Sequence, residues 1–118
     1  MSKQLHLRNS EEFRVVYGQG MRYDSRLFTV FVLPNCLAHH RFGLTASRKA
    51  TGNAVERNRS KRLLREAFRL SAGKLADLQK KYDWVLNARR SILQVKAGAV
   101  LEEFQRIAEL VADREQKS

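Results

Sequence analysis

The sequence has little cysteine and no long apolar stretch, and these absences exclude several classes of protein. Cys36 is the one cysteine among 118 residues, so no disulfide forms within the chain, as expected in a reducing cytosol. No apolar stretch approaches the length of a membrane-spanning helix, and the start, MSKQLHLRNSEEF, lacks the apolar run of a signal peptide. We therefore expect one domain, residues 1–118, in the cytoplasm and without a membrane partner.

Acidic residues are also scarce, with 12 Asp and Glu against 23 Lys and Arg, which gives a net charge of +11. So positive a field on a small protein attracts a polyanion, and nucleic acid is a better candidate than an anionic membrane. A protein nuclease needs a general base, paired carboxylates or a His/Lys arrangement, yet Asp24, Asp77 and Asp83 are scattered. His39 and His40 have no Cys or acidic partner at zinc spacing. We expect neither catalytic nor metal-binding residues in the protein.

The apolar pattern predicts an α+β fold, an α/β sandwich with helices packed on a small sheet of about four strands. Asn9 and Glu12 stand in capping-box register at the start of a first helix, and Gly20 ends it. The expected order is helix, three strands, helix, strand, helix. The segments placed are strands at 27–34, 41–47 and 82–88, helices at 54–71 and 95–117, and a weaker helical piece at 74–81. The strand–helix–strand passage 41–88 is a candidate crossover with parallel strands, for which a right hand is the general expectation.

The helix at 54–71 has two faces when its residues are placed about 100° apart. The apolar face, expected to cover the sheet, contains Leu63, Leu64, Ala67, Phe68 and Leu70. The other face contains Asn58, Arg59, Lys61, Arg62, Arg65 and Arg69, with Arg57 near the border. A solvated face stabilised by ion pairs is the alternative, but Glu56 and Glu66 are too few to neutralise these cations. We predict phosphate binding, with structured RNA favoured because arginine holds phosphate in a bidentate way.

The segment RNRSKRLLREAF, which follows FGLTASRK, resembles the signature of the protein subunit of bacterial ribonuclease P. The similarity extends to EEFRVVYGQG, LFTVFVL and DWVLNARR, and so covers nearly the whole chain. It implies a sandwich whose crossover is left-handed, against the general rule. It also implies a protein subunit that binds the catalytic RNA and precursor tRNA and assists removal of the 5′ leader. The RNA would be the catalyst and would bind most of the magnesium, and no obligate protein partner is implied.

The resemblance also implies roles for individual residues. Contacts with the catalytic RNA are implied for Arg48, Lys49, Arg57, Asn58, Arg59, Lys61, Arg62 and Arg65, and the helical wheel adds Arg69. Arg89 and Arg90 would extend this patch if the ends of the elements converge. A cleft between the first helix and the sheet would bind the single-stranded 5′ leader through Phe13, Tyr17, Phe31 and Arg89, with the aromatic rings stacking on bases. Plain core packing is the alternative for the helical aromatics and stays open for Phe13, whereas Phe28, Val30 and Val32 are assigned to the core. The alternative function is that of a ribosomal-type RNA-binding protein without a role in tRNA processing.

Overall fold

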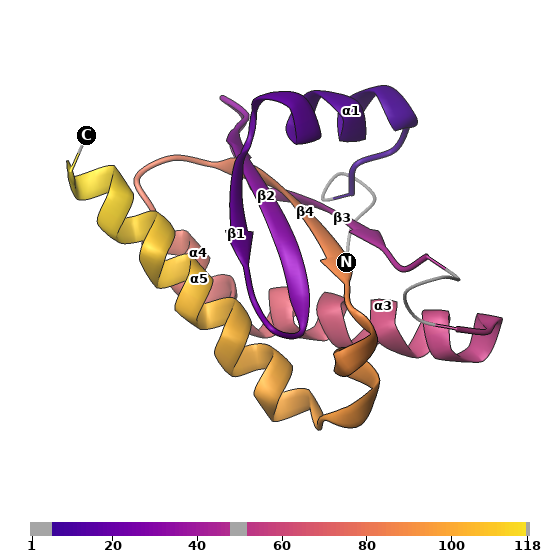
Figure 1. Cartoon of the computed structure of the whole chain (residues 1–118). Helices are drawn as coiled ribbons and strands as arrows, with labels where there is room; N and C mark the ends of the chain where they lie inside the picture. Colours follow the sequence, from indigo (N-terminus) through magenta and orange to yellow (C-terminus); the bar gives the residue numbers. More distant parts are fainter. Residues whose placement is uncertain (1–5, 48–51, 118) are drawn as a thin grey trace.

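The computed structural model describes residues 6–47 and 52–117, and the predicted RNA contacts Arg48 and Lys49 lie outside these ranges. Figure 1 shows the chain as a sheet with helices on both faces. The elements are α1 (Ser10–Gln19), β1 (Met21–Asp24), β2 (Phe28–Pro34), β3 (Arg41–Thr45), α3 (Ala54–Leu70), α4 (Ala72–Ala76), β4 (Tyr82–Ala88), the 3-10 helix η2 (Arg90–Gln94) and α5 (Ala97–Lys117). The predicted order is confirmed; α4 corresponds to the weak helical piece, and η2 is an additional short element.

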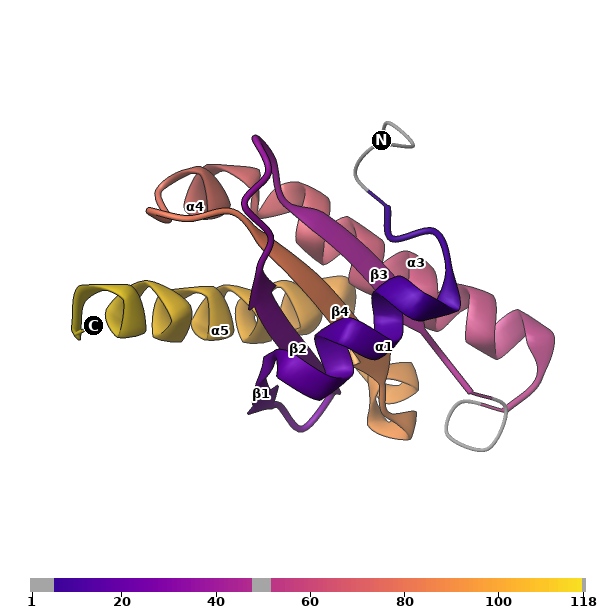
Figure 2. The same ribbon diagram turned by 90° about the horizontal axis from the view of Figure 1, so that it is seen from above.

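The sheet has four strands in the order β1-β2-β4-β3. β1 pairs with β2 and β2 with β4 in antiparallel fashion, whereas β3 and β4 are parallel and are joined through α3. Figures 1 and 2 show α1 on one face of the sheet and α3 and α5 on the other. The two sides of the sheet can therefore perform separate tasks.

Helices α1 and α3 begin with the same kind of cap. Asn9 Oδ1 accepts a hydrogen bond from the Glu12 amide over 2.9 Å, and the Glu12 carboxylate accepts one from the Asn9 amide over 3.3 Å. Asn53 and Glu56 repeat this arrangement before α3. Two of the otherwise unpaired amides at each helix start are satisfied in this way. At the other end of α1, the Gly20 amide donates to the Val16 carbonyl over 2.8 Å.

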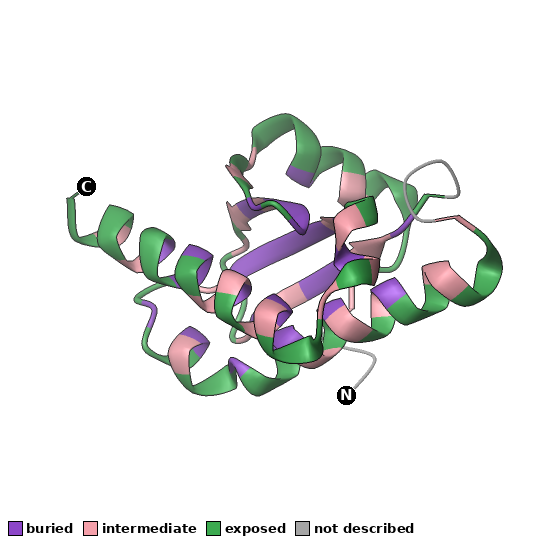
Figure 3. Cartoon of the chain, turned by 60° about the horizontal axis from the view of Figure 1, so that its bottom comes forward, coloured by how far each residue is buried: buried purple, intermediate pink, exposed green. Residues whose placement is uncertain are grey.

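The main core lies between the sheet and helices α3 and α5 (Figure 3). Its largest fully buried side chains include Trp84, Phe42 and Phe104, and Phe28, Val30 and Val32 are buried as predicted. The predicted stripe of α5 is buried as well: Val100, Phe104, Ile107 and Val111. The α1 face has a smaller cluster around Leu7, Val16 and Val85. Since Val16 is the single buried residue of α1, this helix is held by a thin apolar contact.

Four points of the sequence interpretation require correction. Leu70 is 51% exposed because α3 ends at this residue and the chain turns away at Ser71. The helical piece expected at 74–81 is α4, which begins earlier and stops at Ala76. The amides of Gln79 and Lys80 donate to the Glu115 carboxylate, a bonding pattern that replaces a continued helix. The strand β1 was not located by its sequence, and the strand expected at 41–47 ends at Thr45.

The segment before α1 runs beside the outer strand β3. His6 forms an isolated parallel bridge with Phe42, and the Leu7 amide donates to the Phe42 carbonyl over 2.9 Å. The ring of His6 also packs on that of Phe42, with centroids 4.5 Å apart. The free edge of β3 is therefore partly paired.

Candidate nucleic-acid interfaces

Helix α3 has the two faces that its sequence predicts. Leu64, Ala67 and Phe68 are buried, and Leu63 is partly buried. The polar face exposes Asn58, Arg59, Arg62, Arg65 and Arg69, while Lys61 is partly buried. Ser60 was not among the predicted residues; it is fully buried and donates its hydroxyl to the Glu56 carbonyl over 2.9 Å. A small residue at this position lets the helix lie close to its neighbours.

Few of the cations on α3 are neutralised within the described residues. Glu66 pairs with Arg69, and Glu56 is engaged in the helix cap. No ion pair to Arg62 or Arg65 is formed by the part of the chain that the structure describes. These two guanidinium groups are therefore available to a polyanion.

The two arginines nearest the start of α3 differ from the rest. Arg59 Nη1 donates to the Leu93 carbonyl over 3.4 Å and so links α3 to η2. Arg57 lies at the border of the buried face, as predicted, and its Nε is buried without a hydrogen-bond partner among the described residues. The basic face thus reaches η2, which begins at Arg90 directly after Arg89.

On the other face of the sheet, an open groove runs beside α1. It is lined by Arg8, Asn9, Ser10, Phe13, Arg14, Tyr17 and Thr45. The ring of Phe13 lies directly over Gly43, where a Cβ atom would come within 2.5 Å of it. Phe13 is only partly buried and combines a packing role with a place in the groove wall. A glycine at position 43 is therefore required for α1 to lie so close to the sheet.

The predicted pair Tyr17 and Phe31 does meet: Tyr17 lines the groove, and its ring contacts that of the partly buried Phe31 beside it. Their ring centroids are 5.0 Å apart in an edge-to-face arrangement, and Tyr17 is 39% exposed. The Tyr17 hydroxyl donates to Asn87 Oδ1 over 2.8 Å, and the Thr45 hydroxyl bonds to the same oxygen. The guanidinium of Arg22 lies 5.8 Å from the centroid of the Phe31 ring. Asn87 and Arg22 were not predicted, because only the strand pairing brings them to this place.

The strand register explains how these groups come together. Thr45 and Thr29 both stand opposite Asn87, and Asp24 stands opposite Thr29, so the four residues form one polar row across the sheet. The next row contains Gly43, Val85, Phe31 and Arg22. Both rows lie on the face that α1 covers in part.

Arg89, predicted to contact the leader, lies at the end of the polar row. Its Nη2 donates to Asp24 Oδ1 over 3.2 Å, and Arg22 Nε donates to the same oxygen over 3.1 Å. The hydrogen bond from Arg22 and the positive charges of both arginines hold the pKa of Asp24 below its ordinary value.

Helix α1 is joined to the sheet by a partly buried ion network. Arg41 Nη1 donates to Glu12 Oε2 over 2.8 Å, while Arg41 Nε and Nη2 each donate to one oxygen of Asp83 over 2.8 Å. Asn35 Nδ2 also donates to Asp83 Oδ1, over 2.9 Å. The hydrogen bonds that Arg41 donates to Asp83 raise the pKa of Arg41 above its ordinary value, so this guanidinium stays charged. Since α1 buries little apolar surface, this network fixes where its first turn lies.

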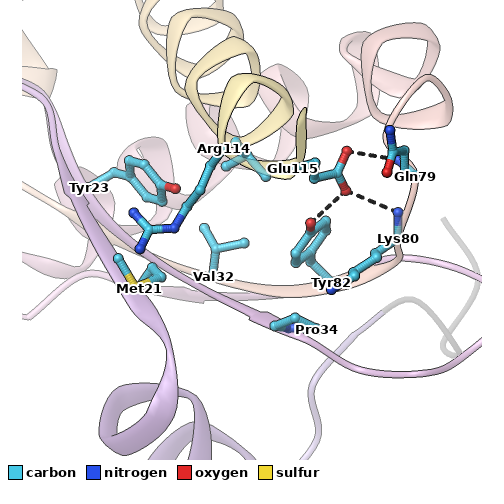
Figure 4. Close-up of a pocket in the computed structure, with 10 residues that line it drawn as sticks. Met21, Tyr23, Val32, Pro34, Gln79, Lys80, Tyr82, Arg114 and Glu115 are labelled. Carbon is cyan, nitrogen blue, oxygen red and sulfur yellow. Dashed lines mark hydrogen bonds between the residues drawn. The ribbon is translucent and has the colours of Figure 1, made fainter. Parts of the chain in front are cut away.

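A separate hollow of about 150 Å³ lies under the last turns of α5, away from both surfaces (Figure 4). Met21, Tyr23, Val32, Pro34 and Tyr82 are among its lining residues. The Glu115 carboxylate at its rim accepts hydrogen bonds from the Tyr82 hydroxyl over 2.5 Å and from two backbone amides. Burial and this bond raise the pKa of Tyr82, so its phenol stays protonated. The carboxylate therefore fastens the end of α5 to the segment before β4.

The described residues contain no group of three or more His, Cys, Asp or Glu side chains placed to hold a metal ion. Among the helices in the described ranges, none is long and apolar enough to cross a bilayer. Two surfaces are therefore candidates for binding nucleic acid: the basic face of α3 and the aromatic groove beside α1.

A sandwich with an arginine-rich helix on one side and an aromatic groove on the other defines a class of RNA-binding protein. The family model described as ribonuclease P matches residues 1–111. The ribonuclease P protein component of an Exiguobacterium species is 37% identical over 107 residues, which cover 91% of this chain and 90% of that protein. That of Methylococcus capsulatus is 40% identical over 95 residues, covering 80% and 71%.

Solved structures agree with these matches. The ribonuclease P protein from Thermotoga maritima superposes with a TM-score of 0.76 at 27% identity, covering 87% of this chain and 94% of that one. A Staphylococcus aureus ribonuclease P protein gives a TM-score of 0.77 over 90% and 94% of the two chains, and its 24% identity supports the fold alone. The chain belongs to the family of bacterial ribonuclease P protein components. It is thus a subunit of a ribonucleoprotein endoribonuclease for tRNA processing, in which the RNA is the catalyst.

Proposed function

We propose that the two faces of the sandwich divide the work of the subunit. The basic face of α3 binds the ribonuclease P RNA, and the groove beside α1 binds the single-stranded 5′ leader of precursor tRNA. The observation that carries this proposal is the contact between the exposed Tyr17 and the partly buried Phe31, on the sheet face opposite to α3. The chain would act as a single RNA-binding domain, residues 1–118, in the cytoplasm.

The chemistry of each face suits its partner. Arg62 and Arg65 are exposed guanidinium groups, which bind phosphates of structured RNA through paired hydrogen bonds. Aromatic rings bind single-stranded bases by stacking and demand no fixed sequence, which suits a protein that serves many precursors. Arg89 lies beside Asp24 at the end of the polar row, and it would contact a strand that passes the aromatic pair.

Magnesium would be held mainly by the RNA. The carboxylates nearest the basic face do not fit a metal site, because Glu56 is engaged in the cap of α3 and Glu66 is paired with Arg69. The contribution of the protein would be electrostatic: cations on α3 lower the repulsion between RNA and substrate, and so help the complex retain magnesium. The metal would supply stabilisation of charge at the phosphate that is cleaved.

The leader groove is tested by replacing Tyr17 and Phe31 together with alanine. The quantity to measure is the ratio of holoenzyme affinities for tRNA with a leader of several nucleotides and for tRNA without one. We expect the precursor to lose about 1–3 kcal/mol of binding free energy per ring while binding of mature tRNA is unchanged. Val15→Ala, on the exposed side of the same helix, is the matched control and should keep the wild-type ratio.

An unchanged ratio in the double variant would show that these rings serve only for packing. A ribosomal-type RNA-binding role predicts a further result: tight RNA binding with no stimulation of 5′ processing at low magnesium. Reconstitution with a bacterial ribonuclease P RNA and precursor tRNA distinguishes these functions.

A further inference from the structure

Two arginines converge on one carboxylate where the polar row of the sheet ends. Arg22 Nε lies 3.1 Å and Arg89 Nη2 lies 3.2 Å from the same atom, Asp24 Oδ1. The three side chains come from β1 and from the end of β4, and they are 57%, 45% and 56% exposed for Arg22, Arg89 and Asp24 respectively. An exposed carboxylate thus occupies the point where two guanidinium groups meet.

This cluster adjoins the aromatic groove. Arg22 stands opposite Phe31 in the strand register, and its guanidinium lies 5.8 Å from the centre of that ring. Asp24 pairs with Thr29 across β1 and β2, in the row that also contains Asn87, which accepts the hydrogen bond of the Tyr17 hydroxyl. A base stacked near Phe31 would therefore have its backbone close to the two arginines.

A third guanidinium adds positive charge to the same place. Arg106 on α5 donates from Nη2 to the backbone carbonyl of Asp24 over 3.3 Å. Figure 1 shows the hairpin between β1 and β2 next to η2 and the start of α5. Arg106 is also paired with Glu103 at 3.3 Å, so two carboxylates, Asp24 and Glu103, face three cations at this corner, and the remaining positive charge favours an anion.

We propose that Arg22 and Arg89 form a binding site for one phosphodiester group of the RNA strand that crosses the groove, and that Asp24 occupies this site until a phosphate displaces it. The proposal rests on the leader-binding role of the groove. It adds a phosphate site, a role for Arg22 within that site, and an internal competitor, Asp24, that sets the affinity.

Replacing Asp24 with a phosphate at the two arginines costs little free energy. Ion pairs between exposed side chains contribute little to stability, so Asp24 is readily replaced. A phosphodiester offers two anionic oxygens to the same donors, and guanidinium groups bind such oxygens in a bidentate way. Asp24 meanwhile holds both arginines near the position they would need, which reduces the cost of ordering them on binding.

The test is the variant Asp24→Asn, which keeps the shape of the side chain and removes its charge. In the holoenzyme we expect affinity for precursor tRNA to rise by about threefold to tenfold, with affinity for mature tRNA unchanged. Glu109→Gln is the matched control, since it makes the same charge change and releases Lys74 on the opposite side of the sheet. That control should leave the precursor-to-product ratio as in the wild type.

A mutant cycle and a modified substrate locate the phosphate. The gain from Asp24→Asn should vanish when Arg22→Gln and Arg89→Gln are also present. A leader with one neutral methylphosphonate linkage, moved step by step, should abolish the gain at a single position.

No gain in precursor affinity from Asp24→Asn, or a gain that survives without the two arginines, overturns the proposal. The proposed function fails separately, because its measure is the loss of precursor binding when Tyr17 and Phe31 are replaced. If the aromatic variants lower the ratio while Asp24→Asn leaves it unchanged, the groove binds the leader and the phosphate lies elsewhere.

Discussion

Trp84 Nε1 donates a hydrogen bond over 3.1 Å to His40 Nδ1, a nitrogen that also accepts the backbone N–H of Tyr82 over 3.0 Å. The second ring nitrogen of His40, Nε2, lies 3.0 Å from the carbonyl oxygen of Leu75. A carbonyl only accepts, so the proton of the neutral imidazole is on Nε2. His40 therefore connects α4 to β4 in its uncharged form, and burial lowers its pKa below the usual 6.5.

This geometry predicts a loss of stability in mild acid. A group whose pKa is lowered by folding binds protons more readily in the unfolded chain, so its contribution is complete above pH 6.5 and declines as the pH falls toward the folded pKa. Urea unfolding at a series of pH values should show this decline in the wild type. In His40→Gln the decline through this window should be largely absent.

His39→Gln serves as the control, since His39 is the adjacent, less buried histidine. It should keep the wild-type pH dependence. Parallel profiles for the wild type and His40→Gln would assign the acid sensitivity to another group.

The network around Arg41 predicts a second effect, on stability and binding together. Arg41→Met leaves Asp83, which is 6% exposed, without its bidentate partner. Breaking a buried pair on one side costs about 3–5 kcal/mol, measurable by urea unfolding. Because Glu12 also loses its link to the sheet, α1 should move and precursor binding should weaken more than product binding.

Adding Asp83→Leu to Arg41→Met should restore part of the lost stability, since it removes the unpaired buried charge. It should not restore the precursor-to-product ratio, because the link to Glu12 stays broken. Recovery of both quantities would mean that α1 does not depend on Arg41.

Neighbouring residues of α3 should respond in opposite ways. Leu64 is fully buried, and Leu64→Ala should lower the free energy of unfolding by about 2–5 kcal/mol. Arg65 is exposed, and Arg65→Ala should leave the melting temperature nearly unchanged while it weakens binding to ribonuclease P RNA. Each lost phosphate contact should also reduce the slope of log affinity against log salt by about 0.7–0.9.

Arg62→Ala should behave like Arg65→Ala, with an additive effect on the salt slope. A large stability loss in either arginine variant, or a slope that does not change, would contradict the assignment of this face to phosphate binding.

The attachment of α5 at Glu115 predicts an effect at lower pH (Figure 4). Burial raises the pKa of Glu115, but hydrogen bonds from Tyr82, Gln79 and Lys80 outweigh it and hold the pKa below 4.5. Its contribution to stability is therefore present above pH 4.5 and is lost as the pH falls through the folded pKa. Glu115→Gln should lower stability at neutral pH by about 1 kcal/mol, and the difference from the wild type should shrink in acid.

The exposed acid Glu102 on α5 provides the comparison. Glu102→Gln should change the free energy of unfolding little at either pH. A similar loss in both variants would point to overall charge instead of the bonds made by Glu115.

The sequence predicts those features that depend on neighbours along the chain. Asn9 and Glu12 form their cap from groups three residues apart, and the two faces of α3 follow from helical periodicity. The sequence did not predict the roles of Asn87, Arg22 and Asp24. These roles depend on the pairing of β1, β2 and β4, which local sequence patterns do not specify. The end of α4 was not predicted for the same reason. The chain after α4 bonds to Glu115, which lies on a helix distant in sequence.

The short bridge between His6 and Phe42 bears on how the protein behaves in concentrated solution. β3 and β1 are the two outer strands, and an unpaired outer strand can join that of another molecule. β1 is only four residues long and carries charges at Arg22 and Asp24, which discourage such joining. At β3, His6 and Leu7 cover part of the edge in the same protective way. Removing them should therefore promote self-association through β3, even where the basic face and the groove are untouched.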